Sequence, residues 1–426
     1  MKRTFTIILL AVLLFTVSLV GVSAKKQKEI TVWGFSHTSD CLKQIKSMYE
    51  QTNPNVKVNI VEQGWGEMRT KALAAIASGK DVPDVIIISS AWAGPMMTSR
   101  GLAPLNRYLD RDFTKKIFPE ALKIYNYKGN QYGVPLDIDL SPIIYRKDLV
   151  APVLSKLGMK EFPKDWDSFL KLLDQLTVDQ NGDGIIDQWG LVMEHGTYYL
   201  QSVFLVQRNG RFFSEDYKQV LVNSLAVVEA VSDYAALFRS KKALLYTGTE
   251  GTGSIAGLLK SGQAVMYIQG PWYRSELELN CPELKGKWAF APMPVKYPGA
   301  PSTALTGICM AVPYNAKNVA EAADFIKYFT GDVAAQTAYF KQVGSPSPLL
   351  SLLDGSFYQL KLDYFGDELI YPALMEGVKN GVAIETFPKQ EMSERILMAL
   401  DEVCFNGKDP KAAMDEAQRE IEQMLP

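Results

Sequence analysis

The sequence predicts an α/β protein built from two lobes, and this prediction rests on three observations. Apolar runs typical of buried strands alternate with helical patterns between residues 30 and 100. The same alternation starts again beyond residue 140. No internal repeat and no linker rich in Ser, Pro or charge separates the two parts of the 426-residue chain. We therefore expect two α/β lobes that share several short crossovers, rather than two independent domains.

The first part of the chain follows the order strand, helix, strand, helix, strand. Its last strand, at 85–88, is apolar at every position, as in a parallel sheet that is covered on both faces. Parallel strands need right-handed crossovers, which the intervening helices supply. The expected elements are a strand at 30–33, a helix with apolar residues at 42, 45, 48 and 49, a strand at 56–60, a helix at 68–77 stopped by Gly79, and the strand at 85–88.

The second part of the chain repeats the alternation and then becomes helical. Asp165 occupies an N-cap position before a helical pattern, and the pair Asp409-Pro410 supplies a cap and an N1 proline to the last helix. The other expected elements are a loop rich in Gly and Asp at 179–190, helical segments at 221–237, a buried strand at 264–268, and a helix with an apolar stripe at 319–329 that Gly331 ends.

The N-terminal segment has the features of a secretory signal. Lys2 and Arg3 precede an apolar run over 5–22, and residues 22–24 (Val-Ser-Ala) are the small residues that signal peptidase prefers. We expect cleavage after Ala24, which places the protein in the periplasm or another extracytoplasmic space. The alternative is an uncleaved anchor, but the run is short for the ~20 apolar residues of a membrane span.

Charge and composition argue against several classes of partner. The chain has 45 Lys and Arg residues against 47 Asp and Glu residues, so it has no basic surplus for nucleic acid or an anionic membrane. Two histidines and four cysteines without a C-x-x-C pair do not form a zinc motif. The cysteines either form disulfides in an oxidising space or stay buried thiols, and the sequence leaves both open. They are Cys41, Cys281, Cys309 and Cys404.

Signatures of common enzymes are missing. The chain has no G-x-S-x-G, H-E-x-x-H or G-x-x-x-x-G-K-[ST] motif. Residues 251–256 match the dinucleotide pattern G-x-G-x-x-A, but we expect no strand before them and interpret them as a loop that leads into a helix. The 47 acidic residues are too many for spacing to single out the carboxylate pair of a glycosidase, so a secreted carbohydrate-active enzyme stays open as an alternative function.

The loop at 179–187 places oxygen ligands at the positions that a short calcium loop uses, and Gly184 allows its sharp turn. Position twelve is Gly190, where a bidentate Glu is expected, so the missing carboxylate would come from elsewhere, with Glu194 as a candidate. The alternative is an Asx-rich turn without metal. No other cofactor is expected. The ligands of a structural Ca²⁺ would be Asp179, Asn181, Asp183, Ile185 and Asp187.

Several aromatic residues fall where strands are expected to end, among them Trp33, Trp92, Tyr198 and Trp272. Ligands of open α/β sheets bind beyond the carboxyl ends of the strands. A flat ring pairs with the C–H face of a sugar, and neighbouring carboxylates or amides bind its hydroxyl groups. The alternative for each single ring is packing in the core.

Two segments close together resemble a family signature. Residues 262–266 (GQAVM) and 270–272 (GPW) are similar to the G-x-A-x-M and G-P-W motifs of family 1 extracellular solute-binding proteins, the maltose-binding-protein-like receptors of sugar ABC importers. Further segments agree with the family in order and spacing, so the resemblance covers nearly all of the mature chain. They are 30–33, 77–85, 132–139, 145–149 and 312–325.

The resemblance implies a periplasmic binding protein of type II, with the ligand in a cleft between two α/β lobes. Crossovers are expected near 137–141, 288–293 and 341–346. The implied function is delivery of a sugar to the permease of an ABC importer by closure of the lobes, without an enzymatic reaction and as a monomer. The implied lobes are 25–138 with 291–342, and 139–290 with 343–426.

The resemblance also implies a set of ligand contacts. Asp139 falls where relatives have a sugar-binding carboxylate, and Trp272 falls on a tryptophan that stacks on sugar. These positions are acidic, hydroxylic or aromatic, which favours a neutral sugar or polyol over a glycerol phosphate. Thr306-Gly307 and the segment 344–348 depart from the family pattern, so the identity of the sugar does not carry over. The other expected contacts are Ser36, His37, Ser90, Trp92, Tyr198, Gln201 and Trp33.

Overall fold

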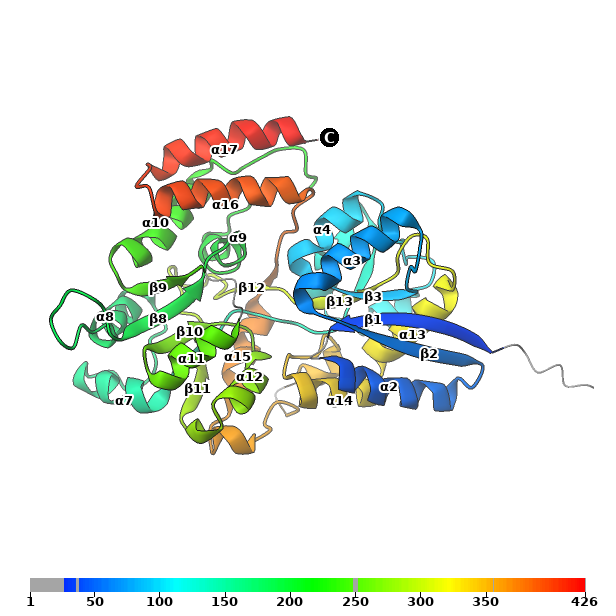
Figure 1. The fold of residues 1–426 in the computed structure, drawn as a ribbon, viewed down its shortest axis with the longest axis horizontal. Helices are drawn as coiled ribbons and strands as arrows, with labels where there is room; N and C mark the ends of the chain where they lie inside the picture. The colour runs from blue at the N-terminus through cyan, green and yellow to red at the C-terminus, as the bar shows by residue number, and fades with distance from the viewer. Residues whose placement is uncertain (1–26, 36–37, 248–251, 355, 426) are drawn as a thin grey trace, which may run out of the picture.

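The computed structural model describes residues 27–35, 38–247, 252–354 and 356–425. Within these residues the predicted two-lobe α/β fold is confirmed, because Figure 1 shows two lobes side by side, each with a sheet and packed helices. The expected signal segment, 1–24, and the expected contacts Ser36 and His37 lie outside the described residues. None of the helices in the described ranges is long and apolar enough to cross a bilayer.

The first lobe contains a five-stranded sheet in the order β2-β1-β3-β13-β6. β1 (Lys28–Phe35) is parallel to β2 (Val56–Gln63) and to β3 (Val85–Ser89), so the carboxyl ends of these strands meet at one edge. β13 (Ile308–Ala311) runs antiparallel between β3 and β6 (Gly133–Pro135). The other elements of this lobe are α2 (Ser39–Thr52), α3 (Trp65–Ser78), α4 (Ser90–Thr98), α5 (Arg111–Thr114), α6 (Pro119–Ile124), β4 (Asn126–Tyr127), β5 (Asn130–Gln131), α13 (Val319–Gly331) and α14 (Val333–Val343).

The second lobe contains a sheet in the order β11-β7-β10-β8-β9. β8 (Trp189–Glu194) is parallel to β9 (Ala243–Tyr246) and to β10 (Ala264–Ile268). β7 (Ile143–Arg146) runs antiparallel between β10 and β11 (Trp288–Ala291). The other elements from this part of the chain are α7 (Lys147–Lys156), α8 (Trp166–Leu176), α9 (Thr197–Tyr199), η2 (Leu200–Leu205), η3 (Val206–Arg208), α10 (Leu225–Arg239), α11 (Thr252–Ser261), α12 (Tyr273–Asn280) and η4 (Pro282–Leu284).

The C-terminal part of the chain is mostly helical, as expected. α16 and α17 pack on each other and on α10 of the second lobe, and they form the top of that lobe in Figure 1. β14 pairs in parallel with β12 (Ala304–Leu305), away from both large sheets. The elements of this part are η5 (Leu350–Leu352), η6 (Asp363–Phe365), α15 (Ile370–Asn380), β14 (Val382–Ala383), α16 (Gln390–Cys404) and α17 (Pro410–Met424).

The helix boundaries follow the capping signals. Gly79 ends α3 in the left-handed conformation, with φ at 66°, and its N–H donates to the carbonyl of Ala75. The Asp165 carboxylate accepts the N–H of Ser168 at the start of α8. The Asp409 carboxylate likewise caps α17. These three boundaries were predicted from residue type alone.

Two sequence predictions of local structure are wrong. The helix expected from residue 221 starts only at Leu225, because Leu221 donates its N–H to the carbonyl of Phe212 and is held extended against that loop. A strand does precede the G-x-G-x-x-A segment, since β9 ends at Tyr246. The first Gly of that segment, Gly251, lies outside the described residues.

The crossovers between the lobes lie side by side and are hydrogen-bonded to one another. They are residues 136–142 between β6 and β7, residues 292–307 between β11 and β13, and the segment that follows α14. Ile138 donates its N–H to the carbonyl of Pro346 at 2.8 Å, and Asp139 and Thr306 exchange backbone hydrogen bonds of 2.9 and 2.8 Å. The sheets show which strands belong to each lobe, whereas the residue-by-residue lobe boundaries given above stay a prediction.

The cores of the two lobes are rich in aromatic and branched side chains. The apolar cluster of the first lobe continues past the crossovers to Tyr267, Tyr273 and Trp288 of the second lobe. All four cysteines are buried, free thiols, so the disulfide alternative is wrong for this structure. Burial raises the pKa of the Cys41 and Cys404 thiols to about 12.

Candidate ligand-binding site

Trp272 and Asp139 lie against each other at the crossovers. Trp272 follows β10, and its side chain donates a hydrogen bond to the carboxylate of Asp139. A Cβ placed on Gly270 would lie 2.4 and 2.5 Å from the two oxygens of Asp139 and 2.6 Å from Cδ1 of Trp272. The glycine of the G-P-W motif is therefore required by the close approach of both side chains.

The environment of Asp139 disfavours its negative charge. Burial raises the pKa of this carboxyl well above its usual range, and the negative charge of Asp137 adds to the shift. Two hydrogen bonds to the carboxylate lower its pKa and so oppose this shift. They come from the N–H of Leu140, at 3.0 Å from Oδ1, and from the Trp272 side chain. An additional hydroxyl donor from a ligand would relieve part of the desolvation cost.

Tyr198 joins the same group of residues from α9. Its hydroxyl is 2.9 Å from Oγ1 of Thr306, the residue that pairs with Asp139. Burial and the negative charge of Asp139 raise the pKa of the Tyr198 hydroxyl. Three of the residues predicted to bind the ligand, Trp272, Asp139 and Tyr198, thus come together.

A buried polar network that the sequence did not reveal lies at the carboxyl ends of β8 and β10. Glu194 accepts a hydrogen bond of 3.0 Å from the hydroxyl of Tyr199. Gln269 donates to the hydroxyls of Tyr199 and Tyr267 at 3.2 and 2.8 Å. Burial raises the pKa of Glu194. Because Gln269 directly precedes the G-P-W segment, this network borders the Trp272 position.

The first lobe presents a second aromatic group at the edge where β1, β2 and β3 end. Phe35, the last residue of β1, contacts Trp65 at 4.6 Å and Trp92 at 6.4 Å between ring centroids. Trp65 starts α3 and is 53% exposed, whereas Trp92 is only 7% exposed and leaves little ring surface for a ligand. Trp65 was missed because the helix was expected to begin at Met68. The signal that could have found it is Gly64-Trp65-Gly66 directly after an alternating strand.

Ser90 is buried at this edge, and Trp33 is only partly exposed within the sheet. Ser90 is buried at the start of α4 and donates its N–H to the carbonyl of Gly307 at 2.9 Å. Trp33 pairs with Val61 and Ile86 inside the sheet and packs on the apolar core. β1 extends two residues further than expected, so Trp33 does not stand at a strand end.

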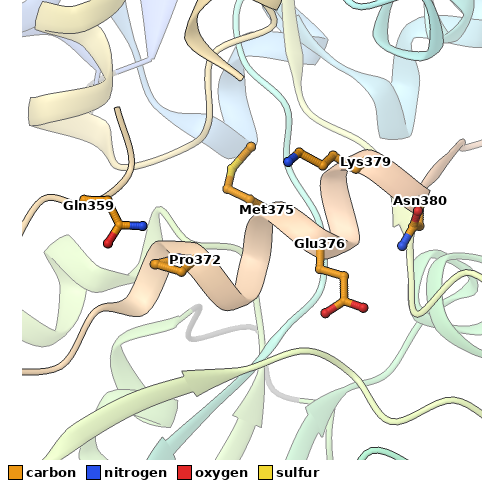
Figure 2. A pocket seen from close by; sticks show the side chains of 6 residues that line it. All are labelled: Gln359, Pro372, Met375, Glu376, Lys379 and Asn380. Atoms are coloured by element: carbon orange, nitrogen blue, oxygen red, sulfur yellow. The ribbon is translucent and has the colours of Figure 1, made fainter. Parts of the chain in front are cut away.

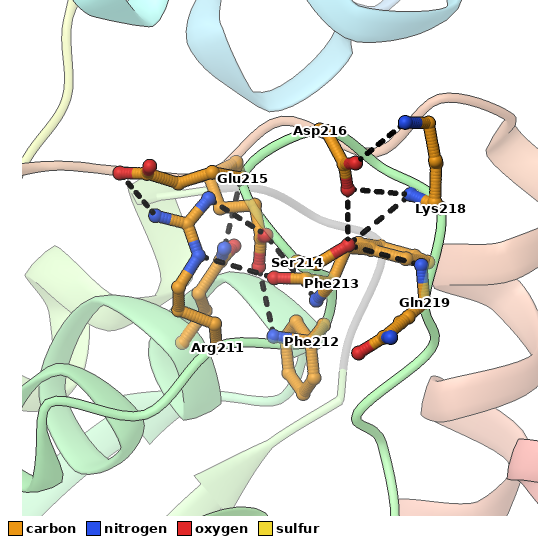
Figure 3. A network of polar contacts seen from close by, with 10 residues as sticks. Arg211, Phe212, Phe213, Ser214, Glu215, Asp216, Lys218 and Gln219 are labelled. Carbon is orange, nitrogen blue, oxygen red and sulfur yellow. Dashed lines mark hydrogen bonds and ion pairs between the residues drawn. The ribbon is translucent and has the colours of Figure 1, made fainter.

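Gln201 makes no hydrogen bond to Trp272 or Asp139 among the interactions of the described residues. It lies on the buried π-helical turn η2, and its amide donates to the carbonyl of Glu385 at 2.9 Å. The Glu385 carboxylate accepts the N–H groups of Phe212 and Phe213 and pairs with Arg211. Figure 3 shows Arg211 beside Phe212 and Phe213, with Glu215 as a further ion-pair partner of its guanidinium group. Burial raises the pKa of Glu385 to about 7. The Gln201 amide is thus held by the 382–389 segment in this structure, and its contact with a ligand stays a prediction.

The 179–187 loop forms a set of internal Asx turns. The two Asp179 oxygens accept the N–H groups of Gly182 and Gly184 at 2.7 and 2.8 Å, and Asp187 accepts that of Gln180 at 2.7 Å. The Asn181 side chain accepts the N–H of Asp183 at 2.9 Å, and the Asp183 side chain accepts the N–H of Ile185 at 2.7 Å. Within the described ranges, no group of three or more His, Cys, Asp or Glu side chains could hold a metal ion. The calcium interpretation therefore stays a prediction.

Glu194 is not placed to complete a metal site in that loop. β8 separates the loop from Glu194, and six residues of strand at roughly 3.3 Å each put them at opposite ends of the sheet. The suggestion that Glu194 supplies the missing calcium ligand is therefore wrong.

Two surface pockets lie away from this group of residues. One, of about 310 Å³, is lined by residues of α15 and by Gln359 (Figure 2). In Figure 2 the side chains of Met375 and Glu376 point to opposite sides of α15. The other pocket, of about 450 Å³, lies beside α10 and Pro410. Neither is lined by a residue that the sequence predicted as a ligand contact.

Comparison with known proteins agrees with this architecture. Residues 39–336 match the family described as bacterial extracellular solute-binding protein. The arabinooligosaccharide-binding protein of Bacillus subtilis (strain 168) is 24% identical over 446 residues, which cover 99% of this chain and 100% of the relative. The lactose-binding protein of Rhizobium radiobacter is 23% identical over 366 residues, 80% of each chain.

A solved structure has the same fold over nearly its whole length. The GacH receptor of Streptomyces glaucescens superposes with a TM-score of 0.75 over 94% of this chain and 98% of that chain, at 21% identity. The resemblance expected from the G-x-A-x-M and G-P-W segments is thus confirmed by an independent match that covers well over half of the sequence. The chain belongs to the bacterial extracellular solute-binding protein family.

Proposed function

We propose that this protein is an extracytoplasmic receptor that binds a neutral sugar or oligosaccharide between its lobes and delivers it to the permease of an ABC importer. The observation that carries the proposal is the contact of Trp272 with Asp139 at the crossovers, with Tyr198 bonded to Thr306, the residue that pairs with Asp139. A ring, a carboxylate and a hydroxyl group gathered in this way suit a ligand with apolar C–H faces and hydroxyl donors. The printed names of the relatives, which include arabinooligosaccharide and lactose binding, support the same ligand class.

The proposed mechanism is closure of the lobes on the ligand. Trp272 stacks on a sugar face from the second lobe, and Trp65, at the start of α3, offers an exposed ring from the first lobe. Each lobe then supplies contacts that only the closed arrangement completes, so the ligand selects that arrangement. The carboxylate of Asp139 accepts a ligand hydroxyl, which offsets its desolvation.

We propose that no covalent chemistry takes place. A glycosidase needs two carboxylates that face the substrate. Asp137, the carboxylate nearest to Asp139 in sequence, is occupied by the N–H of Ile308 at 2.9 Å and the hydroxyl of Tyr339 at 2.8 Å. The relatives reported above are named as binding proteins, which supports the same conclusion.

We further propose that the receptor acts as a monomer and that its partner is the membrane-spanning part of the importer. We expect a monomer because one chain carries both lobes, so a single chain can close on the ligand. Export fits the N-terminal sequence and the extracellular family. The expected cleavage after Ala24 stays part of this proposal and is checked by N-terminal sequencing of the secreted protein.

A thermal-shift screen over sugars tests the proposed function. The screen includes arabino-oligosaccharides, lactose, malto-oligosaccharides, free polyols and glycerol phosphates. We expect a rise in the melting temperature with at least one neutral saccharide, because a ligand that binds only the folded state stabilises it. Chromatography of the same mixtures then shows the saccharide unchanged. Formation of cleavage products would support the alternative function, a secreted carbohydrate-active enzyme. Stabilisation by glycerol phosphates alone would overturn the proposal that the ligand is a neutral sugar.

A further inference from the structure

Arg274 connects the helix that carries the binding tryptophan to the first lobe. It lies on α12, two residues after Trp272, and is only 4% exposed. Its Nη2 donates to the carbonyls of Lys341 at 2.6 Å and Gln342 at 3.3 Å, in the last turn of α14. α14 packs against α2 and α13, which belong to the first lobe (Figure 1). One buried cation therefore links the site in the second lobe to the first-lobe helix that leads into the third crossover.

The chemistry of this contact favours a guanidinium group. The last carbonyls of a helix have no partner within the helix and carry the negative end of its dipole. A guanidinium is planar and keeps its charge when buried, and several of its N–H groups can donate at once. Glu278, one turn further along α12, accepts from Nη1 at 3.1 Å and holds the group in its orientation.

Gly344 makes room for this contact from the first-lobe side. It follows α14 with φ at 97°, in the left-handed region that favours glycine. A Cβ at this position would lie 2.3 Å from Nε of Arg274. The end of α14 is thus shaped, in conformation and in space, to receive the side chain of Arg274.

We propose that Arg274 is a positioning residue for ligand binding, which holds Trp272 in register with the first lobe by capping the C-terminus of α14. α12 has only eight residues, and so short a helix is fixed by tertiary contacts rather than by its own stability. Without the cap, α12 and its tryptophan keep their place in the second lobe but lose their fixed relation to the third crossover. The effect on affinity rests on the proposed function, whereas the effect on lobe arrangement does not.

The test compares Arg274→Met with a matched control, Arg395→Met. Arg395 is also a buried arginine, at 7% exposure, but it pairs with Glu420 at 2.6 and 3.0 Å within the second lobe. Both variants lose a buried cation, so both are expected to lower the melting temperature. Only Arg274→Met removes a contact between the lobes.

The first readout is the distance between the lobes in the protein without ligand. Cysteines are introduced at two exposed positions, Thr70 on α3 and Lys171 on α8, and carry spin labels for dipolar distance measurement. The four native cysteines are buried, which restricts labelling to the introduced ones. We expect a broader or shifted distance distribution in Arg274→Met, an intermediate one in Arg274→Lys, and the unaltered distribution in Arg395→Met. Equal distributions in Arg274→Met and Arg395→Met would overturn the inference.

The second readout is the affinity for the saccharide that stabilises the unaltered protein most. We expect binding about tenfold weaker in Arg274→Met, because Trp272 loses its fixed position, and partial recovery in Arg274→Lys. If no saccharide binds the unaltered protein, the proposed function fails while the distance measurement still decides the inference. If Arg274→Met does not fold, Gly344→Ala displaces the same guanidinium from the first-lobe side, and an unchanged distance distribution there overturns the inference.

Discussion

The hydroxyl of Tyr339 donates a hydrogen bond of 2.8 Å to Asp137, which ties α14 to the first crossover. The other oxygen of Asp137 accepts the N–H of Ile308 at 2.9 Å, at the exit of the second crossover. One carboxylate thus joins three segments that connect the lobes. Burial raises its pKa to about 6, although both hydrogen bonds favour the charged form.

This pKa predicts how stability depends on pH. Asp137 binds its proton more tightly in the folded state, at about 6, than at the ordinary value of 3.8. Its contribution to the free energy of unfolding is therefore fully present below about pH 4 and is lost as the pH rises through about 6, by roughly 3 kcal/mol at most. We expect Asp137→Asn to remove this dependence in urea unfolding between pH 4 and 7.

The control for this prediction is Glu385→Gln. Glu385 is buried with a pKa of about 7, so its contribution has the same sign but extends to higher pH. Each substitution should therefore reduce the slope between pH 4 and 6 without abolishing it. A slope in Asp137→Asn equal to that of the unaltered protein, with a reduced slope in Glu385→Gln, would assign the effect to the wrong carboxylate.

Removal of the Trp272 ring is expected to weaken saccharide binding strongly. Trp272 is only partly buried, so Trp272→Ala should fold, while the loss of a stacked ring worth ~1.5–3 kcal/mol lowers affinity at least tenfold. Calorimetry measures the change. The matched control is Trp33→Ala, which removes a ring packed on the core and should lower the melting temperature without a comparable loss of affinity. Unchanged affinity in Trp272→Ala would remove this residue from the site.

Trp65 should contribute affinity but little stability. Its ring is 53% exposed, so Trp65→Ala removes little buried surface, and we expect a melting temperature close to that of the unaltered protein. Binding of an oligosaccharide should fall about tenfold if the ring stacks on the ligand from the first lobe. Calorimetry measures the change. If Trp65→Ala binds monosaccharides and oligosaccharides with the same affinity as the unaltered protein, Trp65 takes no part in binding.

Asp139→Asn should separate stability from affinity. The substitution replaces a carboxyl group whose charged form is disfavoured by burial and by Asp137, so we expect a higher melting temperature at pH 7. The amide is a poorer acceptor for ligand hydroxyl groups, so affinity should fall, though less than in Trp272→Ala. Thermal unfolding measures the melting temperature, and calorimetry on the same preparation measures the ligand affinity. A lower melting temperature would mean that the carboxylate is held by stronger donors than Leu140 and Trp272.

The 179–187 loop offers a test by metal removal. Because its side-chain oxygens already accept backbone N–H groups, we expect EDTA to leave the melting temperature unchanged. Asp179→Ala should lower the melting temperature only slightly, since the two backbone donors that lose their acceptor are exposed to water. A fall in melting temperature with EDTA that added calcium reverses would establish the calcium site instead.

The local signals of the fold were readable from the sequence because they act over a few residues. Strands β1, β2, β3 and β10 and the caps Asp165 and Asp409 depend on periodicity and on one side chain each. Trp33 was misplaced because the apolar run does not show that β1 continues to Phe35. The late start of α10 follows from a contact with Phe212, which no local pattern encodes.

The candidate site was predictable where a motif marks it and not where distant segments meet. Trp272 and Asp139 were found through the resemblance, and they do touch. The Glu194 and Gln269 network depends on two strands that are neighbours only in the folded sheet. Gln201 was assigned a role by position, and its bond to the carbonyl of Glu385, far away in the sequence, could not be predicted from a local pattern.

The pairing of β3 with β13 determines the order in which the lobes can be completed. Ser89 lies opposite Ile308, so two neighbouring strands of one sheet pair residues that are 219 positions apart in the chain. As the chain is synthesised from its N-terminus, every strand of the second sheet emerges from the ribosome before the first sheet can close. The earliest-made half of the molecule therefore keeps an open β-edge until late in translation, and it becomes native only after the later-made half is available.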